Sequence, residues 1–169
     1  MYRGCISLAI GGLLLLPAAG AQPQAQEDVK LEVVKAKDFA KRLEAFRGKV
    51  VVLDVWAEFC APCKKEFPHL VELHEKYAKK GVACVSVSVD PLEDKENALE
   101  FLKKHKATFT NYLFDERQKV WQDHFHILGP PAVFVYGPDG KLAKHFDPDE
   151  GNGFTYADVE KLVQKLLAK

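Results

Sequence analysis

The chain has 169 residues, 47% of them hydrophobic, so it can bury the core of one ordinary domain but has no room for a second of similar size. Its 24 basic and 24 acidic residues cancel. A balanced charge argues against nucleic acid or an anionic membrane surface as the main partner.

The first segment of the chain has the pattern of an export signal. Residues 1–21 carry one Arg, an apolar core over residues 6–16 and small residues up to Ala21. This pattern predicts a secretory signal peptide and a periplasmic or otherwise extracytoplasmic location. The apolar core is shorter than the roughly 20 residues that span a bilayer, and an uncleaved membrane anchor is the alternative. A polar, flexible tether is expected over residues 22–28, and the folded domain over residues 29–169.

The domain alternates strand-like and helix-like segments. Strands are predicted over residues 29–34, 50–56, 82–89, 109–114, 132–136 and 141–146. Helices are predicted over residues 39–46 with Asp38 as the N-cap, 60–80, 93–106, 116–125, and from the cap at Thr155 to Ala168. This order predicts an α/β fold with a central mixed sheet, parallel at its centre, closed by an antiparallel hairpin at one edge and flanked by helices on both faces.

A dithiol follows the second predicted strand. Cys60-Ala61-Pro62-Cys63 comes after the apolar run 50–56 and opens a long amphipathic stretch. The unpaired backbone N–H groups at a helix start, and the positive end of the helix dipole, favour a thiolate there. A cysteine placed in this way can attack a disulfide and be released by its neighbour. The spacing therefore predicts redox chemistry.

Two further residues lie inside apolar strands. Asp54 interrupts a run of Val, Leu and Trp, where a carboxylate is costly unless it has a partner or a function. Cys84 lies in the strand predicted over residues 82–89, where a free cysteine is expected to be a small buried hydrophobic residue.

A family resemblance covers most of the domain. Residues 52–68, which read Val-Leu-Asp-Val-Trp-Ala-Glu-Phe-Cys-Ala-Pro-Cys-Lys-Lys-Glu-Phe-Pro, strongly resemble the active-site segment of thioredoxin-fold oxidoreductases. Residues 129–134, Gly-Pro-Pro-Ala-Val-Phe, are similar to the loop that carries the cis-proline of that fold. Between Asp90 and Pro131 lie 40 residues, enough for an extra helix and strand, an α/β insertion before the cis-proline loop. With the export signal, the chain resembles the TlpA-like group of exported thiol-disulfide oxidoreductases.

The resemblance implies a thioredoxin fold and a redox-active disulfide between Cys60 and Cys63, with no other cofactor and no metal. Cys60 would be the exposed nucleophile, Cys63 the buried resolving thiol, and Asp54 the carrier of its proton. A lysine usually neighbours that acid in thioredoxins, and Ser86 takes its place here. The partners implied are client proteins with disulfides or thiols and a membrane electron donor. The resemblance also implies a monomer that acts in cell redox homeostasis, in the reductive direction.

Residues around the dithiol are expected to bind the client. Pro131 should follow a cis peptide bond, and Pro130 would offer the client its carbonyl but no N–H. Trp56 and Phe59 would flank the dithiol. We assign Trp56, Pro130 and Pro131 to the client-binding surface.

Three alternatives compete with exchange catalysis. A copper or zinc site could combine the cysteines with histidines, although His69 and His74 would point to different faces of one helix. A peroxidase would need a Pro-x-x-x-Thr-x-x-Cys arrangement, and nothing similar precedes Cys60. A non-catalytic interaction domain could hold a static disulfide, but Asp54 and the cis-proline loop would then lack a purpose.

Overall fold

The computed structural model describes residue 1, residues 28–148 and residues 153–168. The predicted signal peptide, residues 1–21, and nearly all of the predicted tether, residues 22–28, lie outside the described residues. Within the described part of the chain, no helix has both the length and the apolar character that crossing a membrane requires.

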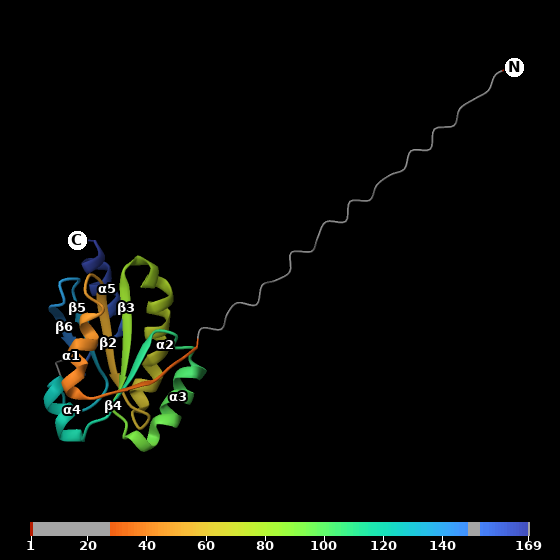
Figure 1. The fold of residues 1–169 in the computed structure, drawn as a ribbon. Helices are drawn as coiled ribbons and strands as arrows, with labels where there is room; N and C mark the ends of the chain where they lie inside the picture. The colour runs from red at the N-terminus through yellow and green to blue at the C-terminus, as the bar shows by residue number, and fades with distance from the viewer. Residues whose placement is uncertain (2–27, 149–152, 169) are drawn as a thin grey trace.

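The strands form one six-stranded mixed sheet in the order β1-β4-β3-β2-β5-β6 (Figure 1). The first four strands in this order run parallel to their neighbours, whereas β5 is antiparallel to β2 and β6 is antiparallel to β5. The arrangement confirms the predicted parallel centre and edge hairpin. The strands are β1 Glu32–Val34, β2 Val50–Trp56, β3 Val82–Ser88, β4 Thr110–Phe114, β5 Ala132–Tyr136 and β6 Leu142–Phe146.

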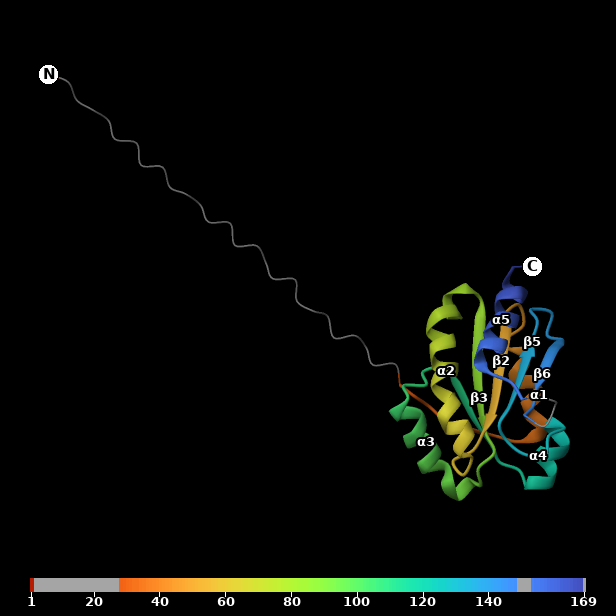
Figure 2. The ribbon, with the colours of Figure 1, turned by 180° about the vertical axis from the view of Figure 1, so that it is seen from behind.

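Helices cover both faces of the sheet. One face carries α1 and α4, and the other carries α2, α3 and α5, as the two opposite views show (Figures 1 and 2). Between β3 and the cis-proline loop lie α3, β4 and α4, which leaves room for the predicted extra helix and strand. The α-helices are α1 Ala36–Glu44, α2 Ala61–Tyr77, α3 Lys95–Lys104, α4 Gln118–Phe125 and α5 Tyr156–Leu167, with 3₁₀ turns η1 Ala78–Lys80 and η2 Leu92–Asp94.

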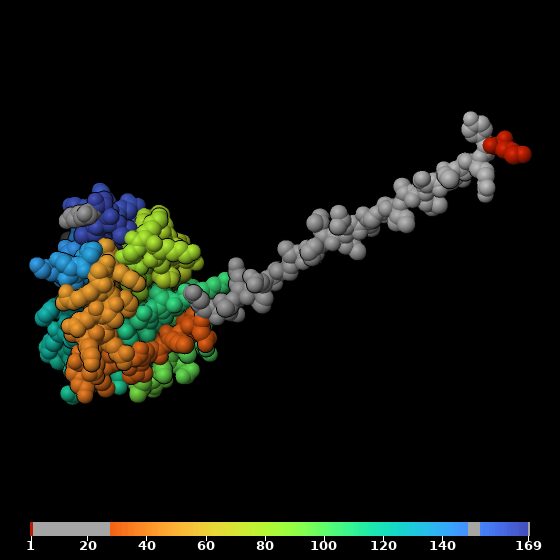
Figure 3. Space-filling view, turned by 45° about the horizontal axis from the view of Figure 1, so that its top comes forward, coloured from red at the N-terminus to blue at the C-terminus, as the bar shows by residue number. Residues whose placement is uncertain are grey.

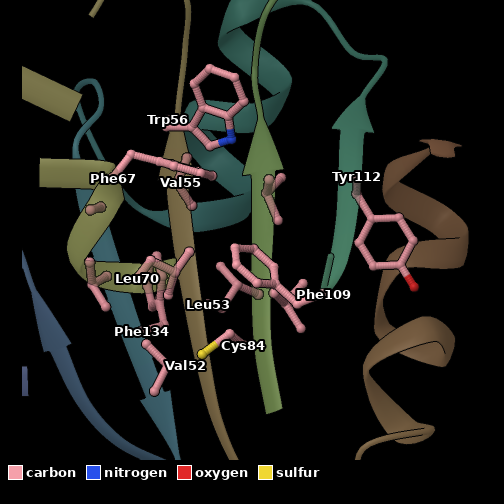
Figure 4. Packing of buried hydrophobic residues seen from close by; sticks show 14 of the residues in the cluster. Val52, Leu53, Val55, Trp56, Phe67, Leu70, Cys84, Phe109, Tyr112 and Phe134 are labelled. Carbon is pink, nitrogen blue, oxygen red and sulfur yellow. The ribbon is translucent and has the colours of Figure 1, made fainter. Parts of the chain in front are cut away.

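The two central strands are buried along their whole length. Every residue of β2 and β3 is buried, as expected for parallel strands that are covered on both faces. Because strand side chains alternate, Leu53 and Val55 of β2 face α1 and α4, whereas Asp54 and Trp56 face α2, α3 and α5. Figure 4 shows the hydrophobic residues packed around these strands.

One predicted helix cap is wrong and another is confirmed. Helix α1 begins at Ala36 with Lys35 as its N-cap, so the prediction that Asp38 caps the helix is wrong. Asp38 lies in the first turn of α1 instead, where its negative charge interacts favourably with the positive end of the helix dipole. At the other end of the chain, the capping box of Thr155 and Asp158 is confirmed and begins α5 at Tyr156.

Helix α5 packs beside the end of α2. In the space-filling view, the blue C-terminal helix lies against the yellow-green segment around the end of α2 (Figure 3). Tyr77 of α2 donates its hydroxyl proton to Glu160 of α5 at 2.6 Å, and Gln164 donates to the Tyr77 hydroxyl at 2.8 Å. These contacts place the first turn of α5 over the face of the sheet that carries Asp54.

A row of polar side chains crosses the buried centre of the sheet. Asp54 on β2 pairs in register with Ser86 on β3, and Ser86 pairs with Asn111 on β4. The Ser86 hydroxyl donates to the Asn111 side-chain oxygen at 2.8 Å. The Asn111 amide donates in turn to backbone carbonyls, those of Lys30, Ala107 and Phe109. Asn111 therefore satisfies Ser86 and ties the start of β4 to the segment before β1.

Candidate active site

The dithiol lies where β2 passes into α2. Cys60 and Cys63 form a disulfide with their Cα atoms 5.3 Å apart. Cys60 is the N-cap of α2, and the Cys63 backbone N–H donates to the Cys60 sulfur at 3.2 Å. Cys60 is 5% exposed and Cys63 is 3% exposed. The expectation of an exposed Cys60 is therefore wrong for the disulfide form, because the short loop folds the sulfur back over the first turn of the helix.

The loop between β2 and the dithiol is held by Asp90, a residue that the sequence analysis did not single out. Both carboxylate oxygens of Asp90 accept from the Glu58 backbone N–H, at 2.9 and 3.0 Å, and one of them also accepts from the Ser88 hydroxyl. Glu58 pairs in turn with Lys64 at 3.1 Å. Asp90 thus fixes the residues directly before Cys60. The sequence contained a signal for this role. Asp90 follows β3, which is parallel to β2, so both strands end at the same edge of the sheet.

Asp54 lies inside the core with a tyrosine as its partner. The carboxylate is buried on β2 and accepts a short hydrogen bond from the hydroxyl of Tyr156, the first residue of α5. Burial raises the pKa of Asp54 to about 7, although the Tyr156 hydrogen bond opposes that rise. The sequence analysis missed Tyr156, which is 102 positions away from Asp54.

The third cysteine of the domain is separate from the disulfide. Cys84 is a free, buried thiol on β3, opposite Val52, as predicted (Figure 4). Burial, and next the charge of Asp54, raise the pKa of the Cys84 thiol well above its ordinary value. A thiol in this state is a poor nucleophile.

The two aromatic residues predicted beside the dithiol, Trp56 and Phe59, differ in exposure. Trp56 is 0% exposed and packs against Phe67 and Phe101, with ring centroids 5.3 and 4.8 Å away. The assignment of Trp56 to the client-binding surface is therefore wrong, because a ring without exposed surface belongs to the core (Figure 4). Phe59, by contrast, is 69% exposed directly before the dithiol.

A hollow of about 820 Å³ adjoins the dithiol loop. Phe59 and Pro130 line it together with Leu92 and Leu128, both of which are exposed. The peptide bond between Pro130 and Pro131 is cis, as predicted. The structure therefore brings Phe59 and the cis-proline loop to the same surface.

The described residues offer little to a metal ion. Within residues 28–148 and 153–168, no group of three or more His, Cys, Asp or Glu side chains is placed to hold one. His69 instead contacts Glu72 of its own helix, at 3.2 Å.

Replacing Asp54 by Asn should change stability in a pH-dependent way. A carboxyl whose pKa is raised on folding holds its proton more tightly in the folded state, so stability falls as pH rises from about 4 to about 7. In the oxidised protein, we expect Asp54→Asn to have little effect below pH 4 and to raise the free energy of unfolding by about 4 kcal/mol above pH 8. Urea denaturation at several pH values measures this difference.

The matched control is Asp123→Asn, which removes an exposed carboxylate that pairs with Lys119. Its effect should stay small across the pH range. A difference between the Asp54 variant and the wild type that does not grow between pH 4 and pH 8 would contradict the raised pKa.

Comparisons with known proteins agree with the fold and the motif. The chain is 34% identical over 106 residues to thiol-disulfide oxidoreductase ResA of Bacillus subtilis, which is 62% of this chain and 57% of that protein. It therefore spans less than two thirds of the length of that relative.

Two solved structures are similar. One is a candidate thiol:disulfide interchange protein DsbE from Chlorobium tepidum, with 32% identity, a TM-score of 0.59, and 75% of this chain and 83% of that chain covered. The other is the thioredoxin domain of a thiol-disulfide oxidoreductase from Bacteroides vulgatus, with 29% identity, a TM-score of 0.57, and 72% and 84% covered. The predicted thioredoxin fold is thereby confirmed. Residues 24–145 match the sequence model of the AhpC/TSA family, and the chain belongs to that family.

Proposed function

We propose that this chain is a thiol-disulfide oxidoreductase that exchanges electrons with client proteins through Cys60 and Cys63. The observation that carries the proposal is the Cys60–Cys63 disulfide at the first turn of α2. The similarity to thiol-disulfide oxidoreductases from two bacteria supports it.

The exchange has two steps. In the reductive direction, the Cys60 thiolate attacks one sulfur of a client disulfide, the client S–S bond breaks, and the leaving client thiolate takes a proton. The Cys63 thiol then gives its proton to Asp54, and its sulfur attacks Cys60. The Cys60–Cys63 disulfide forms and the second client thiolate leaves, so the client gains the two electrons that the dithiol loses.

The position of Cys60 suits the first step. As N-cap, its sulfur accepts the Cys63 backbone N–H, and a thiolate in the same place would keep that donor and the helix dipole. Cys63 lies inside the first turn of α2 and is buried, so desolvation should keep its thiol protonated until it is needed.

The surface around Phe59 is proposed to receive the client. Phe59, Leu92 and Leu128 expose apolar side chains around the hollow beside Pro130. A client segment that lay there would meet the Pro130 carbonyl but no N–H, since proline has none. One of two strand-like hydrogen bonds is then missing, and the client must be chosen by its surface rather than by its backbone.

The location and the reductant complete the proposal. The pattern of residues 1–21 supports export, and the balanced charge and single domain support a monomer that acts on proteins. If the direction is reductive, the oxidised protein must be recharged, and an electron donor in the membrane would supply that step. The resemblance to the TlpA-like group supports this direction.

Alkylation of the reduced protein tests the proposed function. At pH 7 we expect iodoacetamide to modify Cys60 about tenfold faster than glutathione, because a stabilised thiolate is a larger fraction of the sulfur. A Cys60→Ser variant should lose the fast reaction, whereas Cys63→Ser should keep it and trap a mixed disulfide with a client. Cys84→Ser serves as the control and should react like the wild type. If neither Cys60 nor Cys63 reacts faster than glutathione, or if peroxide is consumed faster than disulfides, the proposal fails.

The direction of electron flow can be read from the reduction potential. Equilibration with glutathione buffers should give a value closer to the roughly −270 mV of thioredoxin than to the roughly −120 mV of the oxidant DsbA. A value at the oxidising end would indicate that the protein inserts disulfides and would refute the reductive direction.

Restoring an N–H beside Pro131 tests how the client docks. Pro130→Thr should speed the reduction of a disulfide-bonded peptide and leave the rate with a small aromatic disulfide unchanged, because only the peptide can use the new hydrogen bond. Pro138→Thr, in the turn between β5 and β6, is the control for the substitution itself. If Pro130→Thr and the wild type reduced the peptide at equal rates, the proposal that the client docks without a backbone hydrogen bond from residue 130 would be wrong.

A further inference from the structure

A long-range hydrogen bond joins the buried acid to the last helix. Tyr156 donates its hydroxyl proton to Oδ2 of Asp54, and both residues are buried. The capping box of Thr155 and Asp158 fixes the backbone at the start of α5, where Tyr156 is the first helical residue. The position of the hydroxyl over β2 is thus set by the cap and by the packing of α5 on α2.

The polar neighbours of Asp54 in the sheet are engaged elsewhere. Ser86 lies opposite Asp54 in the register but donates to Asn111, and Val133, on the other side in β5, is apolar. Within the described part of the chain, Tyr156 is the side chain that hydrogen-bonds Asp54. Ser86 stands where thioredoxins usually have a lysine. A neutral donor from α5, the Tyr156 hydroxyl, hydrogen-bonds the Asp54 carboxylate instead.

We propose that Tyr156 is a positioning residue for the exchange reaction: its hydroxyl holds the Asp54 carboxylate in place to accept the proton of Cys63. The inference rests on the proposed function and deepens it. Tyr156 donates to Oδ2, and the carboxylate that it holds is the group that receives the proton. The Cys63 S–H bond breaks, the freed sulfur attacks Cys60, and Tyr156 keeps its own proton throughout.

Other titratable groups also surround this pair. Cys84 lies on β3 opposite Val52, two residues before Asp54, and its thiol is kept protonated by burial. From α2, Glu66 raises the pKa of Tyr156 further, after burial and Asp54, and the His69 ring lies 6.0 Å from the Tyr156 ring. The Tyr156 hydroxyl therefore stays protonated near neutral pH and acts as a donor, not as a base.

The tyrosine ring has a second role as a cover. Tyr156 lines a groove of about 350 Å³ between α2 and α5, together with Glu66, His69 and Glu160. Its ring thereby lies between this groove and Asp54. Removal of the hydroxyl alone leaves the cover in place, so Tyr156→Phe isolates the hydrogen bond from the exclusion of water.

A two-phase reaction tests the inference. When the reduced protein reacts with 5,5′-dithiobis(2-nitrobenzoate), the first thionitrobenzoate is released by attack of Cys60 and the second by attack of Cys63. In the wild type, the rate of the second phase should rise with a midpoint near pH 7. In Tyr156→Phe this midpoint should move up by roughly one to two pH units, because a hydrogen bond to the carboxylate is lost, while the first phase is unchanged.

Three variants act as controls. Tyr112→Phe removes a tyrosine hydroxyl on the opposite face of the sheet, where Tyr112 packs on α1, and should leave both phases unchanged (Figure 4). Asp54→Asn should remove the midpoint, and Asp54→Asn with Tyr156→Phe should match Asp54→Asn alone. A midpoint in Tyr156→Phe equal to that of the wild type, or a shift that persists without Asp54, would overturn the inference. Absence of a fast first phase in the wild type would instead refute the proposed function.

A measurement on the wild type covers the case in which Tyr156→Phe does not fold. The Tyr156 hydroxyl proton should give a slowly exchanging, downfield NMR signal in the oxidised protein. That signal should shift with a midpoint near pH 7 as Asp54 titrates and should change in Asp54→Asn. A hydroxyl signal that is insensitive to Asp54 contradicts the inference.

Discussion

Every residue of β2 is buried between the two helix layers of the sheet, so the chain can approach solvent only beyond the ends of that strand. That constraint places the dithiol where β2 ends and α2 begins. It also leaves Asp54 inside the core, where ionisation is opposed by burial. The position of the disulfide at the end of β2 and the raised pKa of Asp54 within β2 are therefore two results of one buried strand.

Hydrogen bonds from distant segments complete what β2 begins. Asp90 of the loop after β3 holds the Glu58 N–H, and Tyr156 of α5 holds Asp54. Asn111 of β4 accepts the hydrogen bond of Ser86, the residue opposite Asp54 in β3. Each of these donors or acceptors comes from a separate element, so the site is assembled only when β3, β4 and α5 are all in place beside β2.

Much of this could be predicted from local patterns in the sequence. The apolar run of β2, the CxxC spacing and the Thr155–Asp158 cap are short-range signals, and the fold class followed from the order of the segments. Tyr156 could not be paired with Asp54, because nothing in the sequence couples two residues so far apart. The depth of Trp56 was misjudged since strand alternation tells which side a residue faces but not how thickly that side is covered. Asp38 was misplaced because a helix can begin a few residues before an acceptable cap.

The burial of Cys84 has a consequence for the number of products that oxidation can yield. The domain carries three sulfurs, and three sulfurs can in principle scramble among three pairings. Cys84 lies in the apolar interior and close to the negative charge of Asp54, and both suppress its ionised form. Burial therefore disfavours both of the pairings that would include Cys84, and its sulfur fills space in the core as a free thiol.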